Sequence, residues 1–453
     1  MLKRILVANR GEIALRVVRA CRALGMESVA VCSEADKSSV HTRLADHVVH
    51  IGPAETKKSY LNADAIIGAA LIAKADAVHP GYGFLAENPD FAGRCARAGL
   101  TFVGPSPEAI SLMAEKARAR QCAMDAGVPV IPGTEGEASL DRKALAHSAD
   151  LIGYPVMIKA AAGGGGRGMT RVAHPDEFDP KAMTAISEAR GAFGDGRVYV
   201  EKCIENARHV EVQVLCDSHS NYLHLGERDC SVQRRHQKLL EEAPSPGLPE
   251  QMRRDLCEAA LKLCRAVDYR NAGTIEFLVD LAAGQFYFIE MNTRIQVEHP
   301  VTEMVSGVDL VAEQLNIASG LPISFDQKAV EPRGHAIECR INAEDPDNGF
   351  APEPGLIKEL MFPGGPGIRV DSHCETGTVI SPYYDSMIAK IIAWGPTRDQ
   401  AIARMIAALR ATRIEGVPTT IPACIDVLQS PDFQSGAHHT RWFEEVHLQS
   451  SPR

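Results

Sequence analysis

The sequence lacks the features that mark membrane, secreted and zinc-binding proteins. No apolar run approaches the ~18 to 20 residues that a helix needs to cross a bilayer. The apolar run near the N-terminus, residues 5–8, is far shorter than the core of a signal peptide. The twelve cysteines stand singly, without a Cys-x-x-Cys pair, which favours reduced thiols over disulfides or a zinc site. We therefore expect a soluble, cytoplasmic protein with no membrane partner.

An excess of positive charge is also missing. The chain has 58 acidic residues against 48 lysines and arginines, and its formal net charge is −10. A general nucleic-acid binder has a basic balance, so we expect no nucleic-acid partner, although a local basic site could still hold an anion. With 453 residues the chain is too long for one compact core, and we expect two to four domains.

The first hundred residues alternate predicted strands with predicted helices. Strands are expected at residues 3–8, 29–32 and 75–79, with a helix at 11–24, which is typical of a parallel α/β sheet. The first turn between strand and helix, residues 9–12, contains one glycine. It therefore does not predict a dinucleotide site.

The middle of the chain begins with a predicted helix at residues 106–127. Serine caps its free amides, proline suits its first turn, and glycine ends it. The small, polar segment 133–149 predicts a domain boundary, and residues 154–200 predict a short α/β unit.

A glycine-rich loop, residues 163–168, stands between two predicted strands. Lys159 precedes it and Arg167 lies within it. The returning segment 169–172 favours a strand over a helix, and the Gly-Lys-Ser/Thr ending of a P-loop is missing, so neither phosphate motif is predicted. Because glycine lets backbone amides approach an anion, we predict a flap over the phosphates of ATP. The alternative is a surface hairpin with a flexible tip.

Two predicted strands between residues 274 and 291 form a hairpin, and each carries one glutamate among apolar neighbours. If Asp280 pairs with Phe286, Glu276 lies directly opposite Glu290 on the same face. Facing carboxylates repel each other and weaken a sheet. A magnesium ion removes that penalty, because it prefers one or two carboxylates plus substrate phosphates. The alternative is two solvated glutamates on an exposed face.

Polar residues then occupy every second position. In an extended chain alternate side chains share one face. One face would carry five of them: Glu290, Asn292, Arg294, Gln296 and Glu298. Because Asn is disfavoured in strands, this row favours a catalytic face beside the metal over an exposed amphipathic strand. Fully extended, the row would place Glu298 roughly 26 Å from Glu290.

Four cations and a histidine gather in residues 227–238. Phosphates and carboxylates would need such charge, but a solvated basic loop is equally consistent with it. His209, beside Arg208 on a predicted strand, decides nothing by itself.

Together these segments resemble biotin carboxylase of the ATP-grasp superfamily. The resemblance runs from Ile5 to about Glu445 and keeps one order throughout. Its most specific stretches are residues 79–88, 163–168, 227–238 and 290–301, with 335–345 and 382–387 in addition.

The resemblance implies an α/β (α+β) ATP-grasp fold with an N-terminal parallel α/β domain, a mobile lid domain and a C-terminal mixed domain. The implied divisions are an N-terminal α/β domain at 1–115, a linking helix and connection at 116–132, a lid domain with the glycine flap at 133–203, an ATP-grasp catalytic core at 204–334, a biotin carboxylase C-terminal domain at 335–446 and a tail at 447–453.

The resemblance also implies a nucleotide site between the lid and the C-terminal domain. Its residues would be Lys116, Lys159, Gly165, Gly166, Glu201, Lys202, Cys203, Ile204, His209, Gln233, His236, Glu276 and Glu290. Magnesium or manganese would be held by Glu276 and Glu290, with Asn292 near a second ion. Cys203 stands where related sequences often carry an aromatic residue, which bears on nucleotide affinity.

The implied reaction has two stages. Bicarbonate attacks the γ-phosphorus of ATP to give carboxyphosphate and ADP, and carboxyphosphate then delivers carbon dioxide to N1′ of biotin. Four residues would bind bicarbonate: Lys238, Arg294, Gln296 and Val297. Glu298 would deprotonate it, and Arg340 would face the ureido oxygen of biotin with Tyr82 nearby.

The implied partners are other chains. No Ala-Met-Lys-Met attachment motif occurs in the sequence, so biotin would be carried by a separate biotin carboxyl carrier protein and used by carboxyltransferase subunits. The commonest setting is acetyl-CoA carboxylase in fatty acid biosynthesis, and a homodimer is implied.

Two other functions stay open. Another ATP-grasp ligase, joining a carboxylate to an amine, would not need Arg294, Gln296, Glu298 and Arg340 together. A catalytically silent nucleotide sensor or scaffold would be expected to lose Glu276, Glu290 or Glu298.

The missing attachment motif predicts that the purified chain carries no covalent biotin. The intact mass of the chain checks this. A biotinyl addition on a major fraction of the molecules would contradict the expected separate carrier.

Overall fold

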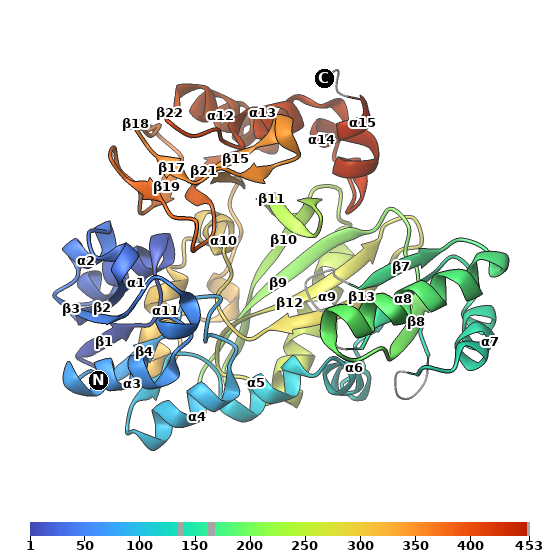
Figure 1. The fold of residues 1–453 in the computed structure, drawn as a ribbon, viewed down its shortest axis with the longest axis horizontal. Helices are drawn as coiled ribbons and strands as arrows, with labels where there is room; N and C mark the ends of the chain where they lie inside the picture. Colours follow the sequence, from blue (N-terminus) through green and yellow to red (C-terminus); the bar gives the residue numbers. More distant parts are fainter. Residues whose placement is uncertain (135–138, 162–167, 451–453) are drawn as a thin grey trace.

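The computed structural model describes residues 1–134, 139–161 and 168–450. The predicted phosphate-covering residues Gly165 and Gly166 lie outside these ranges. Figure 1 shows the N-terminal elements in blue, a small unit in green and the C-terminal elements in red, arranged around long central strands.

The N-terminal sheet is parallel, as predicted. Its strand order is β3-β2-β1-β4-β5, and β1 pairs with both β2 and β4. Helices cover both faces, so Ile5, Leu6 and Val7 of β1 are fully buried. The strands are β1 (Arg4–Val7), β2 (Glu27–Ser33), β3 (His47–Gly52), β4 (Ala77–His79) and β5 (Thr101–Phe102). The helices are α1 (Gly11–Ala23), α2 (Val40–Leu44), α3 (Ala63–Ile72) and α4 (Pro89–Arg97).

The single helix predicted at residues 106–127 is wrong, because the structure has two helices there. α5 (Pro107–Ala114) begins at the predicted cap, where the Ala109 amide donates to Ser106 Oγ. α6 (Lys116–Asp125) follows after Glu115, whose backbone is extended. No glycine or proline marks the break. Because α5 packs on α4 and α6 packs on α9 (Glu250–Ala266), we attribute the break between α5 and α6 to tertiary packing.

The green unit is a small antiparallel sheet of order β7-β6-β8, with two helices packed on it. Its elements are α7 (Arg142–Ile152), β6 (Val156–Ala160), β7 (Met169–Val172), α8 (Phe178–Phe193) and β8 (Val198–Lys202). The α/β unit predicted at 154–200 is thus confirmed. The segment 133–149, predicted as a domain boundary, contains the start of α7, which Asp141 caps.

An antiparallel sheet of eight strands runs through the rest of the chain, in the order β13-β12-β9-β10-β11-β14-β21-β19. Its strands are β9 (Arg208–Cys216), β10 (Tyr222–Arg234), β11 (Gln237–Ala243), β12 (Asn271–Asp280), β13 (Gln285–Asn292), β14 (His335–Asn342), β19 (Ile368–Ser372) and β21 (Met387–Gly395). The remaining helices of the described chain include α10 (His299–Ser306), α11 (Leu310–Ala318), α12 (Arg398–Ala411), α13 (Ile421–Gln429), α14 (Pro431–Ser435) and α15 (Leu448–Ser450). Short paired strands complete it: β15 (Glu344–Asp345) with β16 (Ala351–Pro352), β17 (Gly355–Leu356) with β20 (Val379–Ile380), and β18 (Glu359–Met361) with β22 (Arg413–Glu415).

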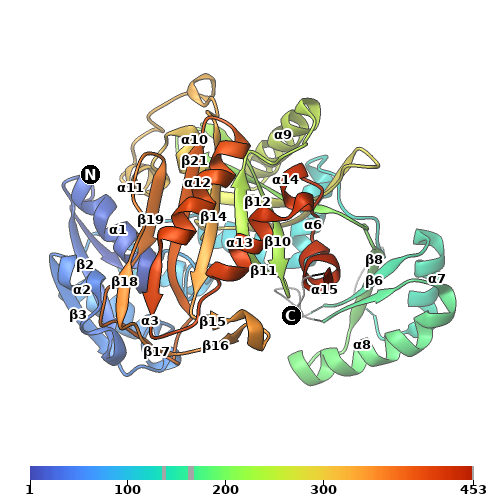
Figure 2. The same cartoon turned by 90° about the horizontal axis from the view of Figure 1, so that it is seen from above.

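The C-terminal end of this sheet has two different faces. Ile337 and Cys339 of β14 belong to the apolar core formed with α12 and α13, which lie over β14 and β21 in Figure 2. Glu338 and Arg340 alternate with them and therefore face the side covered by α10. Polar groups of β14 and β21 thus share a layer with the start of α10.

The β12–β13 hairpin confirms the facing glutamates but not the register from which they were predicted. Asp280 pairs with Gln285, not Phe286. A bulge at Ile289 then shifts the strands by one residue and brings Glu276 opposite Glu290.

The extended row from Glu290 to Glu298 is wrong beyond Asn292. β13 ends there, and the chain bends before α10 begins at His299. Glu290 and Glu298 are therefore not joined by a fully extended chain, and Glu276 and Glu298 both contact one ammonium, that of Lys238.

The basic segment 227–238 is a β-hairpin rather than a solvated loop. Most of β10 is buried, and Arg228 is 0% exposed. The turn is formed by Arg235 and His236, both with positive φ. Within the described residues, no helix is both long and apolar enough to span a bilayer.

Candidate active site

Four charged residues lie side by side across the central sheet. Glu290 on β13 is paired with Glu276 on β12, Glu276 with Glu211 on β9, and Glu211 with Arg228 on β10. Three carboxylates in a row repel one another. Burial together with the charge of Glu276 raises the pKa of Glu290. A divalent cation between Glu276 and Glu290 would relieve this repulsion, so the two residues fit a magnesium site.

The Lys238 ammonium connects three of the buried carboxylates. Its Nζ contacts Glu211, lies 3.3 Å from Glu276 and lies 2.6 Å from Glu298. Burial opposes the charge of these carboxylates, but the ammonium and the neighbouring cations together outweigh burial and lower the pKa of all three, that of Glu211 to about 2. All three are therefore ionised at neutral pH around one cation.

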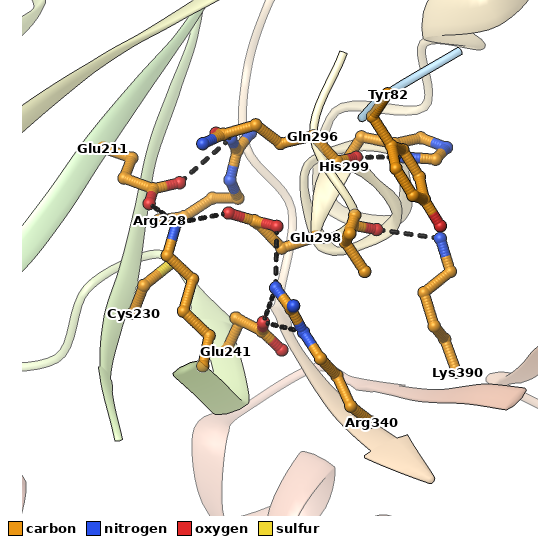
Figure 3. A network of polar contacts seen from close by, with 12 residues as sticks. Tyr82, Glu211, Arg228, Cys230, Glu241, Gln296, Glu298, His299, Arg340 and Lys390 are labelled. Atoms are coloured by element: carbon orange, nitrogen blue, oxygen red, sulfur yellow. Dashed lines mark hydrogen bonds and ion pairs between the residues drawn. The ribbon is translucent and has the colours of Figure 1, made fainter. Parts of the chain in front are cut away.

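Arg228 also binds this group of buried side chains. Its guanidinium donates to Glu211 at 3.2 Å and to the side-chain oxygen of Gln296 at 2.8 Å. It also donates to Gln213, Thr274 and Thr302. Figure 3 shows Arg228 between Glu211 and Gln296. Since Gln296 in turn donates to Glu276 at 2.7 Å, the bend after β13 is fixed to the sheet.

Glu298 lies between two cations. Lys238 contacts one carboxylate oxygen, and Arg340 donates to the other at 2.9 Å. Arg340 also donates to Glu241 at 2.6 Å, and Figure 3 shows it pointing from β14 toward both glutamates. Burial raises the pKa of Glu241 to about 7 despite this partner. Glu298 is thus an ionised carboxylate held in place at both of its oxygens.

Arg294 is positioned by residues other than Glu298. Its Nε donates to Glu87 at 2.8 Å, and its Nη2 donates to Asn292 at 2.8 Å. Glu87 also accepts the Thr293 amide, so it holds the bend from the N-terminal side.

His209 belongs to the carboxylate group. Its Nε2 lies 2.9 Å from Glu276 and 3.2 Å from Glu211. Burial opposes its charge, but these carboxylates raise the pKa of His209 to about 10, so it is a cation at neutral pH. Asn292 completes the surroundings of Glu276 by donating to it at 2.7 Å.

The predicted nucleotide residues of the small sheet form a separate group. Lys159 on β6 lies 2.5 Å from Glu201 on β8, and Arg120 lies 3.5 Å from the same carboxylate. The Lys202 side chain turns away to two backbone oxygens, at residues 153 and 154. Cys203 is buried, and Ile204 is half-buried.

The remaining predicted nucleotide residues lie in the β10–β11 hairpin and at the start of α6. Gln233 is buried and donates to the Cys230 oxygen, whereas His236 is exposed in the β10–β11 turn. Partial desolvation lowers the pKa of His236, the charge of Glu444 opposes this shift, and the charges of His209 and Lys159 add to it. Lys116 is exposed at the start of α6, and its charge acts on Glu290.

Val297 and Tyr82 are linked through buried charges. The Val297 oxygen accepts a hydrogen bond from Lys390 Nζ at 2.8 Å, and Lys390 lies 3.0 Å from Glu12. The Tyr82 hydroxyl donates to the same Glu12 oxygen.

Sequence reasoning missed charged residues that hold the site: Glu211, Arg228, Glu241, Lys390 and Glu12, which are buried, and Glu87, which is exposed. One local signal could have revealed Lys390, because a single lysine interrupts the apolar strand β21. Arg228 and Glu87 were within segments recognised as specific, but no spacing rule gives their partners.

This geometry defines an ATP-grasp enzyme, in which a small antiparallel sheet stands beside a central antiparallel sheet whose edge hairpin carries facing glutamates. Three family descriptions match the chain in order. Residues 1–110 match the biotin carboxylase N-terminal domain, residues 115–325 the ATP-binding domain of the carbamoyl-phosphate synthase L chain, and residues 338–445 the biotin carboxylase C-terminal domain. The chain belongs to the biotin carboxylase family and is an ATP-dependent carboxylase.

Individual relatives agree over the full length. The biotin carboxylase of a Nostoc species is 54% identical over 98% of this chain and 99% of its own. The structure of a Campylobacter jejuni biotin carboxylase–β-γ-ATP complex has a TM-score of 0.93 at 48% identity and covers 98% of both chains. The biotin carboxylase domain dimer of Hydrogenobacter thermophilus 2-oxoglutarate carboxylase, with MgADP, ADP and bicarbonate, has a TM-score of 0.93 at 47% identity and covers 100% of both chains.

The raised pKa of Glu241 predicts a pH-dependent stability. The folded chain holds this proton up to about pH 7, whereas an ordinary glutamate loses it near 4.5, so Glu241 makes the free energy of unfolding fall as pH rises between these values. Glu241→Gln removes this fall. We expect its melting temperature, relative to wild type, to increase from about pH 5 to about pH 8.

Asp217→Asn is the control for this experiment. Burial opposes the charge of Asp217, but hydrogen bonds lower its pKa, so Asp217 stays ionised across the same pH range. The melting temperature that Asp217→Asn loses relative to wild type should therefore not change with pH. If the melting temperature of Glu241→Gln differs from that of wild type by the same amount at every pH, the raised pKa of Glu241 is contradicted.

Proposed function

We propose that this chain carboxylates biotin carried on a separate carrier protein, with ATP and bicarbonate as the other substrates. The observation that carries this is the convergence of Lys238 and Arg340 on Glu298, beside the facing pair Glu276 and Glu290. One ionised carboxylate thus stands next to a magnesium-type site and is flanked by cations that suit bicarbonate and carboxyphosphate. The related 2-oxoglutarate carboxylase domain carries MgADP and bicarbonate, which supports the same substrates here.

The nucleotide would bind between the small sheet and the central sheet. Lys116, Lys159, His209, Gln233 and His236 would be the nucleotide residues there, together with the segment 201–204. Gly165 and Gly166 would cover the phosphates. Glu276 and Glu290 would hold magnesium or manganese, with Asn292 near a second ion, and the metal would neutralise charge that gathers on the phosphoryl group.

The remaining roles follow from the charges around Glu298. Lys238, Arg294, Gln296 and the Val297 backbone would bind bicarbonate, and Glu298 would accept its proton. The bicarbonate oxygen then attacks the γ-phosphorus of ATP with ADP as the leaving group. Carboxyphosphate releases carbon dioxide to N1′ of biotin, and the phosphate set free would take the N1′ proton.

Biotin would be bound on the C-terminal side of this group. Arg340 would stabilise the negative charge that develops on its ureido oxygen, with Tyr82 alongside. In this structure Arg340 is held by Glu241 and Glu298, so its guanidinium is already positioned before biotin arrives.

The setting we propose is acetyl-CoA carboxylase, with this chain catalysing the first half-reaction of fatty acid biosynthesis in the cytoplasm. A biotin carboxyl carrier protein would bring the biotin, and carboxyltransferase subunits would consume carboxybiotin. A homodimer is supported by the dimeric 2-oxoglutarate carboxylase domain. The domains we propose are 1–115, 133–203, 204–334 and 335–446, with a link at 116–132 and a tail at 447–453, although β11 and β14 of two of them pair in one sheet.

The direct test is ATP cleavage with and without bicarbonate, followed by transfer of isotope from labelled bicarbonate to biotin. We expect cleavage to depend on bicarbonate and the label to reach biotin. Cleavage that responds to an amine and a carboxylate but not to bicarbonate would favour the other ligase, and no cleavage at all would favour a nucleotide sensor.

The facing glutamates predict the effect of Glu290→Gln. Because it removes one of two repelling charges, the metal-free fold should be at least as stable as wild type. The magnesium concentration for half-maximal activity should rise by more than the ~10- to 100-fold that loss of an outer metal partner costs. Glu258→Gln, on the exposed face of α9, is the control. An unchanged magnesium titration would show that Glu290 is not a ligand.

The position of Glu298 predicts a large loss for Glu298→Gln. Glutamine keeps the length of the side chain and one acceptor oxygen for Lys238 or Arg340, so the KM for ATP should change little, whereas bicarbonate-dependent ATP cleavage should fall by ~10²- to 10⁴-fold. Since the ion pairs lower the pKa of Glu298 despite its burial, the loss should be constant across neutral pH. A loss below about tenfold would contradict its role as the base.

A further inference from the structure

A lysine sits in the middle of an otherwise apolar strand. β21 carries Lys390 among Ile, Ala and Met, and this residue is among the largest fully buried side chains. Burying an ammonium costs free energy unless it is paired and hydrogen-bonded. The Lys390 ammonium therefore needs a counter-charge and hydrogen-bond acceptors inside the protein.

Lys390 joins two other parts of the chain. Its Nζ lies 3.0 Å from Glu12 Oε1, in the first turn of α1, and donates to the Val297 oxygen at 2.8 Å. The Tyr82 hydroxyl donates to the same Glu12 oxygen. Figure 3 shows Tyr82 and Lys390 pointing toward one another beside the segment that carries Glu298. One chain of contacts thus runs from Tyr82 through Glu12 and Lys390 to Val297.

The Val297 carbonyl depends on Lys390 because it lies outside helix and strand. A buried carbonyl without a ladder partner must be satisfied by another group. Its neighbours are held by side chains in the same way. The backbone oxygen of Gln296 lies 2.7 Å from His299 Nδ1, and the Glu298 carboxylate contacts the two cations Lys238 and Arg340. Lys390 therefore fixes the peptide that leads directly into Glu298.

A simpler account would assign Glu12 to the helix N-terminus and the ion pair to domain packing. An acidic residue in a first helical turn is stabilising when exposed. Glu12, however, is only 5% exposed and shares its Oε1 with Tyr82 and Lys390. The two residues at the ends of this chain of contacts, Tyr82 and Val297, are those assigned to biotin and bicarbonate.

We propose that Glu12 and Lys390 are positioning residues of the carboxylation reaction. They hold the Val297–Glu298 peptide against bicarbonate and tie it to Tyr82 on the biotin side. This inference rests on the proposed function and adds two residues from α1 and β21 to it. It predicts that their loss weakens the use of bicarbonate and biotin without changing the use of ATP.

The test uses Lys390→Met, Glu12→Gln and the double variant in the full chain. Lys390→Met alone leaves Glu12 buried without a counter-charge, and this variant can fail to fold. The double variant removes both charges at similar volume and keeps an acceptor for Tyr82. We expect it to melt closer to wild type than Lys390→Met does. We also expect its KM for bicarbonate to rise by about tenfold or more, with the KM for ATP within about twofold.

A matched control is Arg398→Met with Glu242→Gln. These residues form another ion pair, at 2.7 Å between half-buried Arg398 on α12 and buried Glu242 on β11, and among the described residues neither hydrogen-bonds to the bend at residues 293–298. The control should lose stability without a selective rise in the KM for bicarbonate. The proposal is overturned if the double variant keeps the wild-type KM for bicarbonate, or if the control raises it equally. The proposed function would instead fail in the wild-type chain, through ATP cleavage that ignores bicarbonate.

Discussion

The site depends on one ammonium group shared by three buried glutamates. Glu211, Glu276 and Glu298 come from β9, β12 and the bend before α10, and each would repel the others without Lys238. Removing carboxylates from water is costly, so cations must lie within contact distance of all of them. Arg228, His209 and Arg340 supply the rest of this charge. The cations that suit an incoming anion are thus already in place.

The continuous central sheet makes this arrangement possible. Because β11 pairs with β14, the strands with Glu276 and Lys238 and those with Arg340 and Lys390 form one surface. The Glu298 segment crosses over that surface between β13 and α10. Residues from the N-terminal part, Glu87 and Glu12, reach it from the other side. Three regions of the chain therefore meet at a bend that has no regular structure.

Local patterns predicted the elements and part of the site, but not its connections. Alternation in the β12–β13 hairpin predicted Glu276 and Glu290 on one face, but from the observed pairing of Asp280 with Gln285 they come to lie opposite each other only through a bulge at Ile289, which no pattern marks. The extended row failed because a period of two continues in the sequence after the strand has ended at Asn292. The partners of Lys390 and Arg340 are separated from them by tens to hundreds of residues, so only the assembled sheet brings them together.

The central claim is that Lys238 holds three ionised carboxylates together. It is tested most directly by the melting temperature of Lys238→Met at about pH 5 and about pH 8, with and without magnesium. Without the ammonium the carboxylates repel more strongly as they ionise, so the account predicts a larger loss of stability at the higher pH, partly restored by magnesium. An equal loss at both pH values, unaffected by magnesium, would contradict it.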